Sequence, residues 1–277
     1  MEYKLIFCDL DETLLNDQHM VPEINVEWIQ KARKEHHVRF VPSTGRGYMQ
    51  IQPELTQLGL VDQSDEYSLS FNGGALTENK GNRLMEFNGL PFAKMKEIFL
   101  FGLKQNVCMH VYTNTTLYVY HLNDGEKQRM TNQKLEAIYP QEDSVDFLKD
   151  EPIAKILYQN TDVDYLMSLE DKMTSITKGT VSVSYSSNRY MEFNALGVDK
   201  GQGLRDLAKR LGVDISETIA VGDNYNDMAM LGAAGLSVAA GNAVEDVKKA
   251  CDYTTRANNN EGVVAELIRK FIYHEDI

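Results

Sequence analysis

The sequence has few cysteines and no excess of positive charge, and each shortage excludes a class of protein. Only three cysteines occur in 277 residues, and Cys8, Cys108 and Cys251 are too far apart for a disulfide framework or a zinc site. The 28 lysines and arginines are outnumbered by 41 aspartates and glutamates, which gives a formal net charge of -13. Nucleic acids and anionic membranes are bound by basic surfaces, so we expect neither as a partner.

The sequence also lacks a long apolar run. No segment is long and apolar enough to cross a bilayer, and the chain opens on a short apolar segment, Tyr3–Phe7, instead of a signal peptide. We therefore expect a cytoplasmic protein. The composition, 43% hydrophobic and 25% charged, is that of a globular chain with one large domain or two smaller ones.

A pair of carboxylates follows the first apolar segment. Tyr3–Phe7 is predicted to be a buried strand of a parallel sheet, and Asp9 and Asp11 come just beyond it. Ligands of open α/β sheets bind there, so the pair indicates either a site or an ordinary acidic turn. In a site, one carboxylate can attack phosphorus and become an aspartyl-phosphate, while the other protonates the leaving oxygen and later takes a proton from water. A divalent cation with oxygen ligands, Mg2+, would have to neutralise the pair.

Polar residues follow two further predicted strands. Val38–Pro42 runs into Ser43–Arg46, where a hydroxyl and free backbone N–H groups can hold a phosphate oxygen or simply form a loop and helix cap. A helix is expected over Tyr48–Leu58, either interrupted or started by Pro53. A third strand of the sheet, Tyr67–Phe71, leads to Asn72, which begins a strong Asn-Gly turn signal but should lie near the same sheet edge.

Two more charged clusters lie in the last third of the chain. Lys200 precedes a predicted helix over 202–211, where a cation opposes the helix dipole, so either an anion lies nearby or the lysine is a solvated surface group. The predicted strand Thr218–Val221 leads to Asp223, a candidate metal ligand. Asp227 falls in the next helical turn, where a favourable N-terminal charge is the simplest explanation.

Between residues 80 and 191 the regular alternation of strands and helices is lost. Hairpin-like strands with intervening helices, one expected over 126–137, indicate an α+β module inserted into an α/β domain formed by 1–79 and 192–277. The polar hairpin tip at Asn188 and Arg189 is its best candidate for ligand contact, because a guanidinium suits phosphate or sugar hydroxyls. Five tyrosines could also line a binding face, although strand alternation alone explains most of them: Tyr112, Tyr118, Tyr120, Tyr185 and Tyr190.

The order of these clusters resembles the motifs of the haloacid dehalogenase-like (HAD) phosphatase superfamily, and the position and size of the insertion resemble its Cof-type branch. The resemblance implies a Rossmann-like parallel-sheet core with an α+β cap domain that selects the substrate. It implies a Mg2+-dependent phosphatase of small phosphorylated metabolites, with sugar phosphates first and nucleotides, flavin mononucleotide or pyridoxal phosphate also open. The motifs are Asp9-Leu10-Asp11-Glu12-Thr13, Ser43-Thr44-Gly45-Arg46, Phe71-Asn72-Gly73-Gly74, Val198-Asp199-Lys200-Gly201, Gly222-Asp223-Asn224-Tyr225-Asn226-Asp227-Met228 and Ala240-Gly241-Asn242-Ala243.

The resemblance also implies a role for individual residues. Asp9 is the implied nucleophile and Asp11 the implied general acid and base. The implied Mg2+ ligands are the carboxylates of Asp9 and Asp223 and the backbone carbonyl of Asp11, while Asp227 would orient Lys200 or a water on the metal. The residues implied to bind the substrate or its phosphoryl group are Thr44, Lys200, Asn226, the backbone at Leu10 and Gly45, and Arg46 at the mouth between cap and core.

Some questions stay open at this point. Glu12 stands where the family commonly has glycine, which adds charge near the site and could alter the loop without removing a catalytic atom. A phosphomutase or a non-catalytic sugar-phosphate-binding regulator on the same fold are the alternative functions. A dinucleotide-binding protein is disfavoured because no Gly-x-Gly-x-x-Gly follows the first strand. We expect a monomer or weak homodimer.

Overall fold

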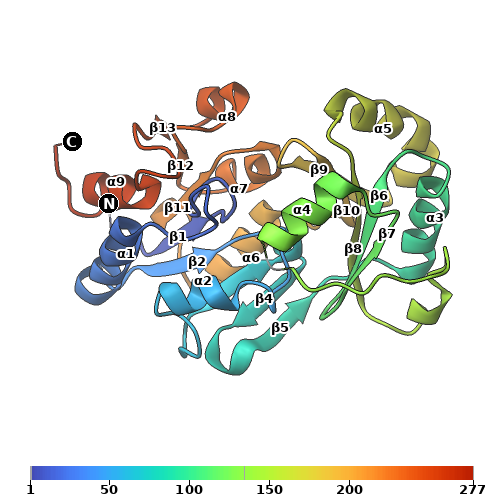
Figure 1. Cartoon of the computed structure of the whole chain (residues 1–277). Coiled ribbons are helices and arrows are strands. Elements are labelled where there is room, and N and C mark those ends of the chain that lie inside the picture. Colours follow the sequence, from blue (N-terminus) through green and yellow to red (C-terminus); the bar gives the residue numbers. More distant parts are fainter. Residues whose placement is uncertain (1, 134, 277) are drawn as a thin grey trace. The chain divides into compact units, whose positions relative to one another are not determined.

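The computed structural model describes residues 2–133 and 135–276, which belong to two compact units (Figure 1). The core unit takes both ends of the chain, Met1–Glu86 and Asp199–Ile277, and the inserted unit is the continuous segment Phe87–Val198. The boundaries predicted at 79/80 and 191/192 lie a few residues earlier than those of the units. The strand β5 (Arg83–Phe87) belongs to a sheet that begins in the core unit, and β10 (Tyr190–Ala195) belongs to the sheet of the inserted unit.

A five-stranded parallel sheet forms the centre of the core unit, in the order β13-β12-β11-β1-β2. The neighbours β1 and β11 pair from Leu5 opposite Thr218 to Cys8 opposite Val221, and both strands are buried throughout. Short, continuously apolar strands of this kind need cover on both faces, which confirms the predicted α/β core. The strands are β1 (Leu5–Cys8), β2 (Arg39–Pro42), β11 (Thr218–Gly222), β12 (Leu236–Ala239) and β13 (Tyr253–Thr254).

The helices of the core unit begin and end at residues suited to those positions. The N-cap of α6 is Asp199, whose side chain accepts a hydrogen bond from the Gln202 N–H, and the helix ends at Gly212 in the left-handed conformation. Helices α1 and α9 lie side by side (Figure 1). The helices are α1 (Glu23–His36), α2 (Gln52–Gln57), α6 (Lys200–Leu211), α7 (Met228–Leu231), α8 (Glu245–Ala250) and α9 (Val263–Phe271).

Of the two forms predicted for the helix within Tyr48–Leu58, the structure has the one started by Pro53. Only α2, Gln52–Gln57, is α-helical, and residues 48–51 form turns before it. Pro53 explains the late start, because proline has no N–H to donate and fits only the first turn of a helix.

The prediction that the third strand belongs to the parallel sheet is also wrong. The strand β3 (Tyr67–Ser70) pairs antiparallel with β4 (Ala75–Glu78) in a separate sheet of order β3-β4-β5. One parallel bridge, between Ser43 and Leu69, joins this sheet to the chain after β2. Asn72 still reaches the predicted edge, where its N–H donates to the Thr44 carbonyl at 2.9 Å.

In its described residues, the inserted unit is an antiparallel sheet of order β7-β6-β8-β10-β9 with the helices α3, α4 and α5, which confirms the predicted α+β module. The apolar face of this sheet packs with α3 and α5 in one core. Helix α4 stops before the predicted end at 137, and residue 134 lies outside the described residues. The elements are α3 (Phe92–Gly102), β6 (Cys108–Thr113), β7 (Leu117–Tyr120), α4 (Asp124–Asn132), β8 (Ile153–Gln159), α5 (Val163–Thr177), β9 (Val181–Ser186) and β10 (Tyr190–Ala195).

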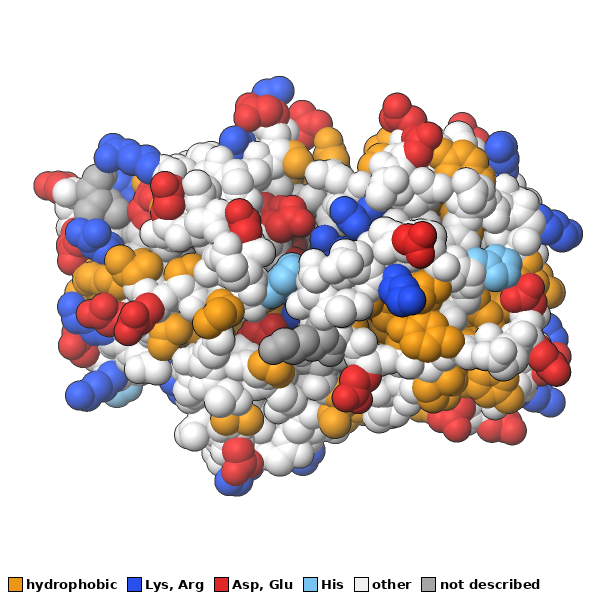
Figure 2. All heavy atoms as spheres, viewed as in Figure 1, with side chains coloured by type: hydrophobic (Ala, Val, Ile, Leu, Met, Phe, Trp, Pro, Cys, Tyr) orange, Lys and Arg blue, Asp and Glu red, His pale blue; other side chains and the backbone are white. Residues whose placement is uncertain are grey.

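The surface mixes charges of both signs. On the face shown in Figure 2, acidic and basic side chains are interspersed over both units. Within 2–133 and 135–276, no helix has the length and apolar character that a membrane crossing requires.

Candidate active site

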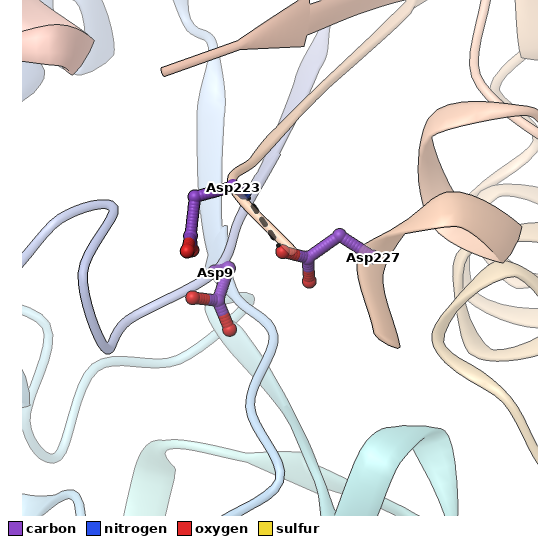
Figure 3. Close-up of side chains that lie close together, drawn as sticks. All are labelled: Asp9, Asp223 and Asp227. Carbon is purple, nitrogen blue, oxygen red and sulfur yellow. Dashed lines mark hydrogen bonds between the residues drawn. The ribbon is translucent and has the colours of Figure 1, made fainter. Parts of the chain in front are cut away.

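Three carboxylates meet beyond the carboxyl ends of β1 and β11. Asp9 follows β1 and Asp223 follows β11, and because these strands are parallel neighbours, the two residues emerge at the same sheet edge. Asp227 joins them from a 3-10 turn, Tyr225–Asp227, that precedes α7. All three are buried, and each offers an oxygen within 4.8 Å of the others. Figure 3 shows the Asp223 side chain pointing toward Asp9, while Asp227 accepts from the Asp223 backbone N–H.

One buried ammonium faces these three carboxylates. Lys200, the first residue of α6, is fully buried and donates to Asp9 Oδ1 and, at 2.7 Å, to Asp227 Oδ1. Burial, with the charge of Asp227 added, raises the pKa of Asp9 to about 8, although Lys200 opposes the rise. Burial also raises the pKa of Asp223, and Asp9 and Asp227 add to that rise. For Lys200 burial alone would lower the pKa, but Asp227 and Asp9 outweigh it and the pKa is raised. The site is therefore short of positive charge.

The oxygens left free in this cluster fit Mg2+. Asp227 is occupied, because its Oδ2 accepts the N–H groups of Asp223 at 2.9 Å and Asn224 at 3.2 Å, and its Oδ1 accepts from Lys200. Thr13 donates to Asp223 Oδ1 at 2.7 Å. Asp9 Oδ2 and Asp223 Oδ2 accept no hydrogen bond from any residue that the structure describes. Two neighbouring carboxylate groups that each keep an oxygen without a hydrogen-bond partner among the described residues are the hard donors that Mg2+ prefers.

We expect Mg2+ binding to release a proton near neutral pH. A carboxyl group with a raised pKa of about 8 is largely protonated at pH 7, and it must ionise before it can bind a cation. Calorimetry in two buffers of different ionisation enthalpy should count up to about one proton per Mg2+ at pH 7. The release should fade as the pH rises above about 8, and it should shrink in Asp9→Asn. Proton-free binding at pH 7 would contradict the raised pKa.

Free donors for an anion lie beside the carboxylates. The backbone N–H groups of Leu10 and Gly45 donate to no residue in the described parts of the chain. Thr44 is buried, with its Oγ accepting the Arg46 N–H at 3.1 Å, and the buried Ser43 Oγ has no hydrogen-bond partner among the described residues. Loop N–H groups and hydroxyls at strand ends form the usual cradle for phosphate oxygens.

Arg46 is held by two carboxylates of the core unit. Its Nε donates to Asp11 Oδ2 at 2.8 Å, its Nη2 donates to Asp11 Oδ1, and its Nη1 donates to Glu54 at 3.0 Å. The predicted substrate-binding arginine is thus paired with the predicted general acid and base. Sequence reasoning missed Glu54, because a glutamate in the first turn of a short helix is ordinary and only the fold brings it to Arg46.

A tight turn carries Asp11. The N–H groups of residues 13–15 all reach the Leu10 carbonyl, at 2.8 to 3.4 Å. Glu12 has a φ of 64°, a left-handed conformation that glycine adopts without strain, which explains why glycine suits this position. Asn242 donates to the Glu12 carbonyl at 2.7 Å and holds the turn. Glu12 therefore keeps the loop geometry that a glycine would have.

The remaining predicted site residues are Asn226, Asn188 and Arg189. Asn226 is partly exposed, in the same 3-10 turn as Asp227. Asn188 and Arg189 lie at the β9–β10 hairpin of the inserted unit, where Ser187 and Asn188 have φ values of 48° and 47°. Two consecutive positive φ values are typical of the tightest hairpin turns.

The inserted unit carries a polar sheet face opposite its apolar core. It contains Tyr112 and Tyr190, whereas the other three candidate tyrosines, Tyr118, Tyr120 and Tyr185, lie on the apolar face. Alternation along the strands places the residues of the polar face on one side of the sheet. On β6, β8, β10 and β9 all of them but Leu157 carry a polar side-chain atom, whereas the edge strand β7 adds the apolar Leu117 and Val119 to the same face. Read across β6, β8, β10 and β9, its three rows are Tyr112, Lys155, Asn194, Ser182; His110, Leu157, Glu192, Ser184; and Cys108, Gln159, Tyr190, Ser186.

Three residues of this polar face, His110, Ser184 and Asn194, have buried side-chain atoms without a hydrogen-bond partner among the described residues. Lys155 and Glu192 form a buried ion pair, and Lys155 lies 5.0 Å from the Tyr112 ring centre. Burial, helped by Lys155, lowers the pKa of His110 to about 3, so this histidine is neutral. The described buried atoms of the inserted unit that lack a hydrogen-bond partner belong to this face or to residues beside it: His110 Nδ1 and Nε2, Glu126 Oε2, Arg129 Nε, Ser184 Oγ, Arg189 Nε and Asn194 Oδ1.

Comparisons with known proteins agree with the fold and the motifs. The model of the haloacid dehalogenase-like hydrolase family matches residues 6–267. The chain therefore belongs to the haloacid dehalogenase-like hydrolases, in their Cof-type branch, and is a phosphatase.

Relatives cover nearly the whole chain. YxeH of Bacillus subtilis (strain 168) is 31% identical over 269 residues, which are 94% of this chain and 96% of that protein. The 5-amino-6-(5-phospho-D-ribitylamino)uracil phosphatase YcsE of the same organism is 28% identical over 272 residues, covering 98% and 97%. The crystal structure of a haloacid dehalogenase-like hydrolase from Bacteroides thetaiotaomicron superposes with a TM-score of 0.82 at 30% identity, covering 97% of this chain and 99% of that chain.

Proposed function

We propose that this phosphatase hydrolyses small phosphorylated metabolites with Mg2+ through an aspartyl-phosphate on Asp9. The observation that carries the proposal is the setting of Asp9: this buried residue lies beside Asp223, Lys200 donates to its Oδ1, and its Oδ2 accepts no hydrogen bond from the described residues. Bound Mg2+, held by the Asp9 and Asp223 carboxylates and the Asp11 carbonyl, would neutralise charge on the carboxylates and the phosphoryl group.

The residues then divide the reaction into two steps. In the first, an Asp9 oxygen forms a bond to phosphorus, the bond from phosphorus to the leaving oxygen breaks, and Asp11 gives that oxygen a proton. In the second, Asp11 takes a proton from water as the water oxygen bonds to phosphorus, which frees inorganic phosphate and restores the Asp9 carboxylate. The buried Lys200 ammonium stabilises the charge that both steps place between Asp9 and the phosphoryl group.

Donors in the loops hold the phosphoryl group. The backbone N–H groups of Leu10 and Gly45 and the Thr44 hydroxyl supply neutral hydrogen bonds. Asn226 adds a contact to the substrate, and Asp227 keeps Lys200 oriented through its 2.7 Å hydrogen bond. The second oxygen of Asp227 is held by two backbone N–H groups, which suits a supporting residue better than a metal ligand.

Hydroxyl-rich metabolites such as sugar phosphates are the proposed substrates, and the inserted unit is the proposed cap that selects them. Its polar face offers unpaired donors and acceptors together, as a polyol requires, and Asn188 and Arg189 lie at the hairpin next to it. The relative YcsE is named for a substrate with a phosphorylated ribityl chain, which is also a polyol. The proposal also places the protein in the cytoplasm and makes it a monomer or weak homodimer.

The test of this function is phosphate release from a panel of esters, with and without Mg2+. The panel holds 4-nitrophenyl phosphate, hexose and pentose phosphates, glycerol phosphate, nucleotides, flavin mononucleotide and pyridoxal phosphate. The proposal expects metal-dependent turnover with the highest kcat/KM on a hydroxyl-rich alkyl ester. If the Mg2+-loaded protein hydrolyses nothing in the panel, or only transfers phosphate between sugars, the hydrolytic proposal is wrong.

Asn194→Leu should separate binding from stability on the polar face. Leucine has nearly the shape of asparagine but removes the buried, unpartnered Oδ1, so the free energy of unfolding should rise by about 1 kcal/mol. The lost acceptor should raise KM for the preferred hydroxyl-rich ester by roughly tenfold. KM for 4-nitrophenyl phosphate should stay within about twofold. An unchanged KM for the hydroxyl-rich ester would remove this face from the substrate site.

A further inference from the structure

The Arg46 guanidinium is committed to two carboxylates of the core unit. Two of its nitrogens donate hydrogen bonds to the Asp11 carboxylate in a bidentate pair, Nε at 2.8 Å and Nη2. The third nitrogen, Nη1, donates to Glu54 at 3.0 Å. Burial alone would lower the pKa of Arg46, but Asp11 and then Glu54 outweigh it and raise the pKa, so the arginine stays charged. A planar fork of this kind fixes both the position and the rotation of the carboxylate that it holds.

Both ends of this arrangement are anchored. The Arg46 backbone is held on both sides, since its N–H donates to Thr44 Oγ at 3.1 Å and its carbonyl accepts the Phe71 N–H at 2.9 Å. Glu54 lies in the first turn of α2, and its side chain is only 8% exposed, compared with 12% for Arg46 and 23% for Asp11. Asp11 is thus the most exposed of the three side chains.

We propose that Arg46, anchored by Glu54, is a positioning residue that orients the Asp11 carboxyl for proton transfer. This inference rests on the proposed phosphatase chemistry and replaces a direct contact of Arg46 with the phosphoryl group. When Asp11 gives or takes a proton, one of its oxygens must face the leaving group or water. One Arg46 contact then gives way, while the other contact and the Glu54 anchor keep the carboxyl in place.

The chemistry of the leaving group distinguishes positioning from phosphate binding. An alkoxide is a poor leaving group and needs a proton from Asp11, whereas 4-nitrophenolate leaves without one. A mispositioned Asp11 should therefore harm alkyl esters much more than the aryl ester. The constant kcat/KM reports steps up to the first irreversible one, so it isolates the transfer to Asp9 from the later hydrolysis.

The experiment compares kcat/KM on 4-nitrophenyl phosphate and on the alkyl ester that the wild type hydrolyses fastest, both with Mg2+. In Glu54→Gln, which loses the anchoring charge, we expect the alkyl-to-aryl ratio of kcat/KM to fall at least tenfold. Arg46→Lys keeps a positive charge but loses the fork, and it should lower the same ratio at least as much. Both variants should also show a burst of 4-nitrophenol, because Asp11 is needed again to hydrolyse the aspartyl-phosphate.

The matched control is Glu66→Gln. Glu66 forms a half-buried pair with Arg33 at 2.7 Å elsewhere in the core unit, so its loss should lower the melting temperature without changing the ratio. If Arg46 instead binds the phosphoryl group, Arg46→Lys will raise KM for both esters and the inhibition constant of inorganic phosphate alike. An unchanged ratio in folded Glu54→Gln and Arg46→Lys overturns the positioning role. A wild type that hydrolyses neither ester overturns the proposed function instead.

Discussion

Replacing Asp9 with asparagine should lower phosphate release from every substrate by about four orders of magnitude or more, because the nucleophile itself is removed. Asparagine keeps the shape of the side chain and can still meet Lys200, but its amide cannot form the acyl phosphate. Steady-state assays with 4-nitrophenyl phosphate and with the preferred alkyl ester measure the loss.

The matched control for this variant is Asp62→Asn. It makes the same chemical change in the core unit, at a side chain that is 63% exposed. The Asp62 carboxylate accepts from the Lys80 ammonium and from the Gly81 N–H. Its kcat should stay within about twofold of wild type. The opposite result would be an Asp9→Asn protein that folds, binds Mg2+ weakly and still releases phosphate at a rate within about tenfold of wild type. It would show that another group is the nucleophile.

Lys200→Met should damage both chemistry and stability. The ammonium is the one cation that contacts Asp9 among the described residues, so its loss should lower kcat by about 100- to 1000-fold. Methionine also leaves Asp9 and Asp227 as buried carboxylates without a counter-charge. Removing one partner of a buried ion pair costs about 3–5 kcal/mol, which chemical denaturation should reveal as a lower free energy of unfolding.

A double variant separates these two effects. In Lys200→Met with Asp227→Asn, one of the uncompensated carboxylates is gone, so part of the free energy of unfolding should return. Activity should not return, because the charge that stabilises the transferring phosphoryl group is still missing. Recovery of activity together with stability would mean that Lys200 acts only by keeping the site folded.

The positions of the strands and their polar ends could be predicted from the sequence. Leu5–Cys8 and Thr218–Gly222 are short apolar runs, and charged residues follow each of them. These charged residues predict a site at the carboxyl ends of the parallel strands. Asp9 and Asp223 follow strands that are neighbours in the sheet. This strand order could not be predicted from local sequence patterns; only the resemblance to a family implied it.

Side-chain partnerships between distant segments could not be predicted. Arg46 and Asp11 are separated by 35 positions, and nothing in either local pattern favours an ion pair over a phosphate contact. The antiparallel pairing of β3 was missed for a related reason, since its buried residues would suit either sheet. The polar face of the inserted sheet did leave a signal, because Tyr190, Glu192 and Asn194 alternate with the apolar residues between them.

The central claim is that Asp9 carries the phosphoryl group during turnover. The most direct measurement is mass spectrometry of the acid-quenched wild-type protein after brief mixing with 4-nitrophenyl phosphate and Mg2+. The account predicts a phosphoryl mass increment on the peptide that contains Asp9, sensitive to hydroxylamine and absent from Asp9→Asn. The account would be contradicted if the protein turned over rapidly, if burst kinetics showed that an intermediate accumulates, and if the phosphoryl mass increment lay on a residue other than Asp9.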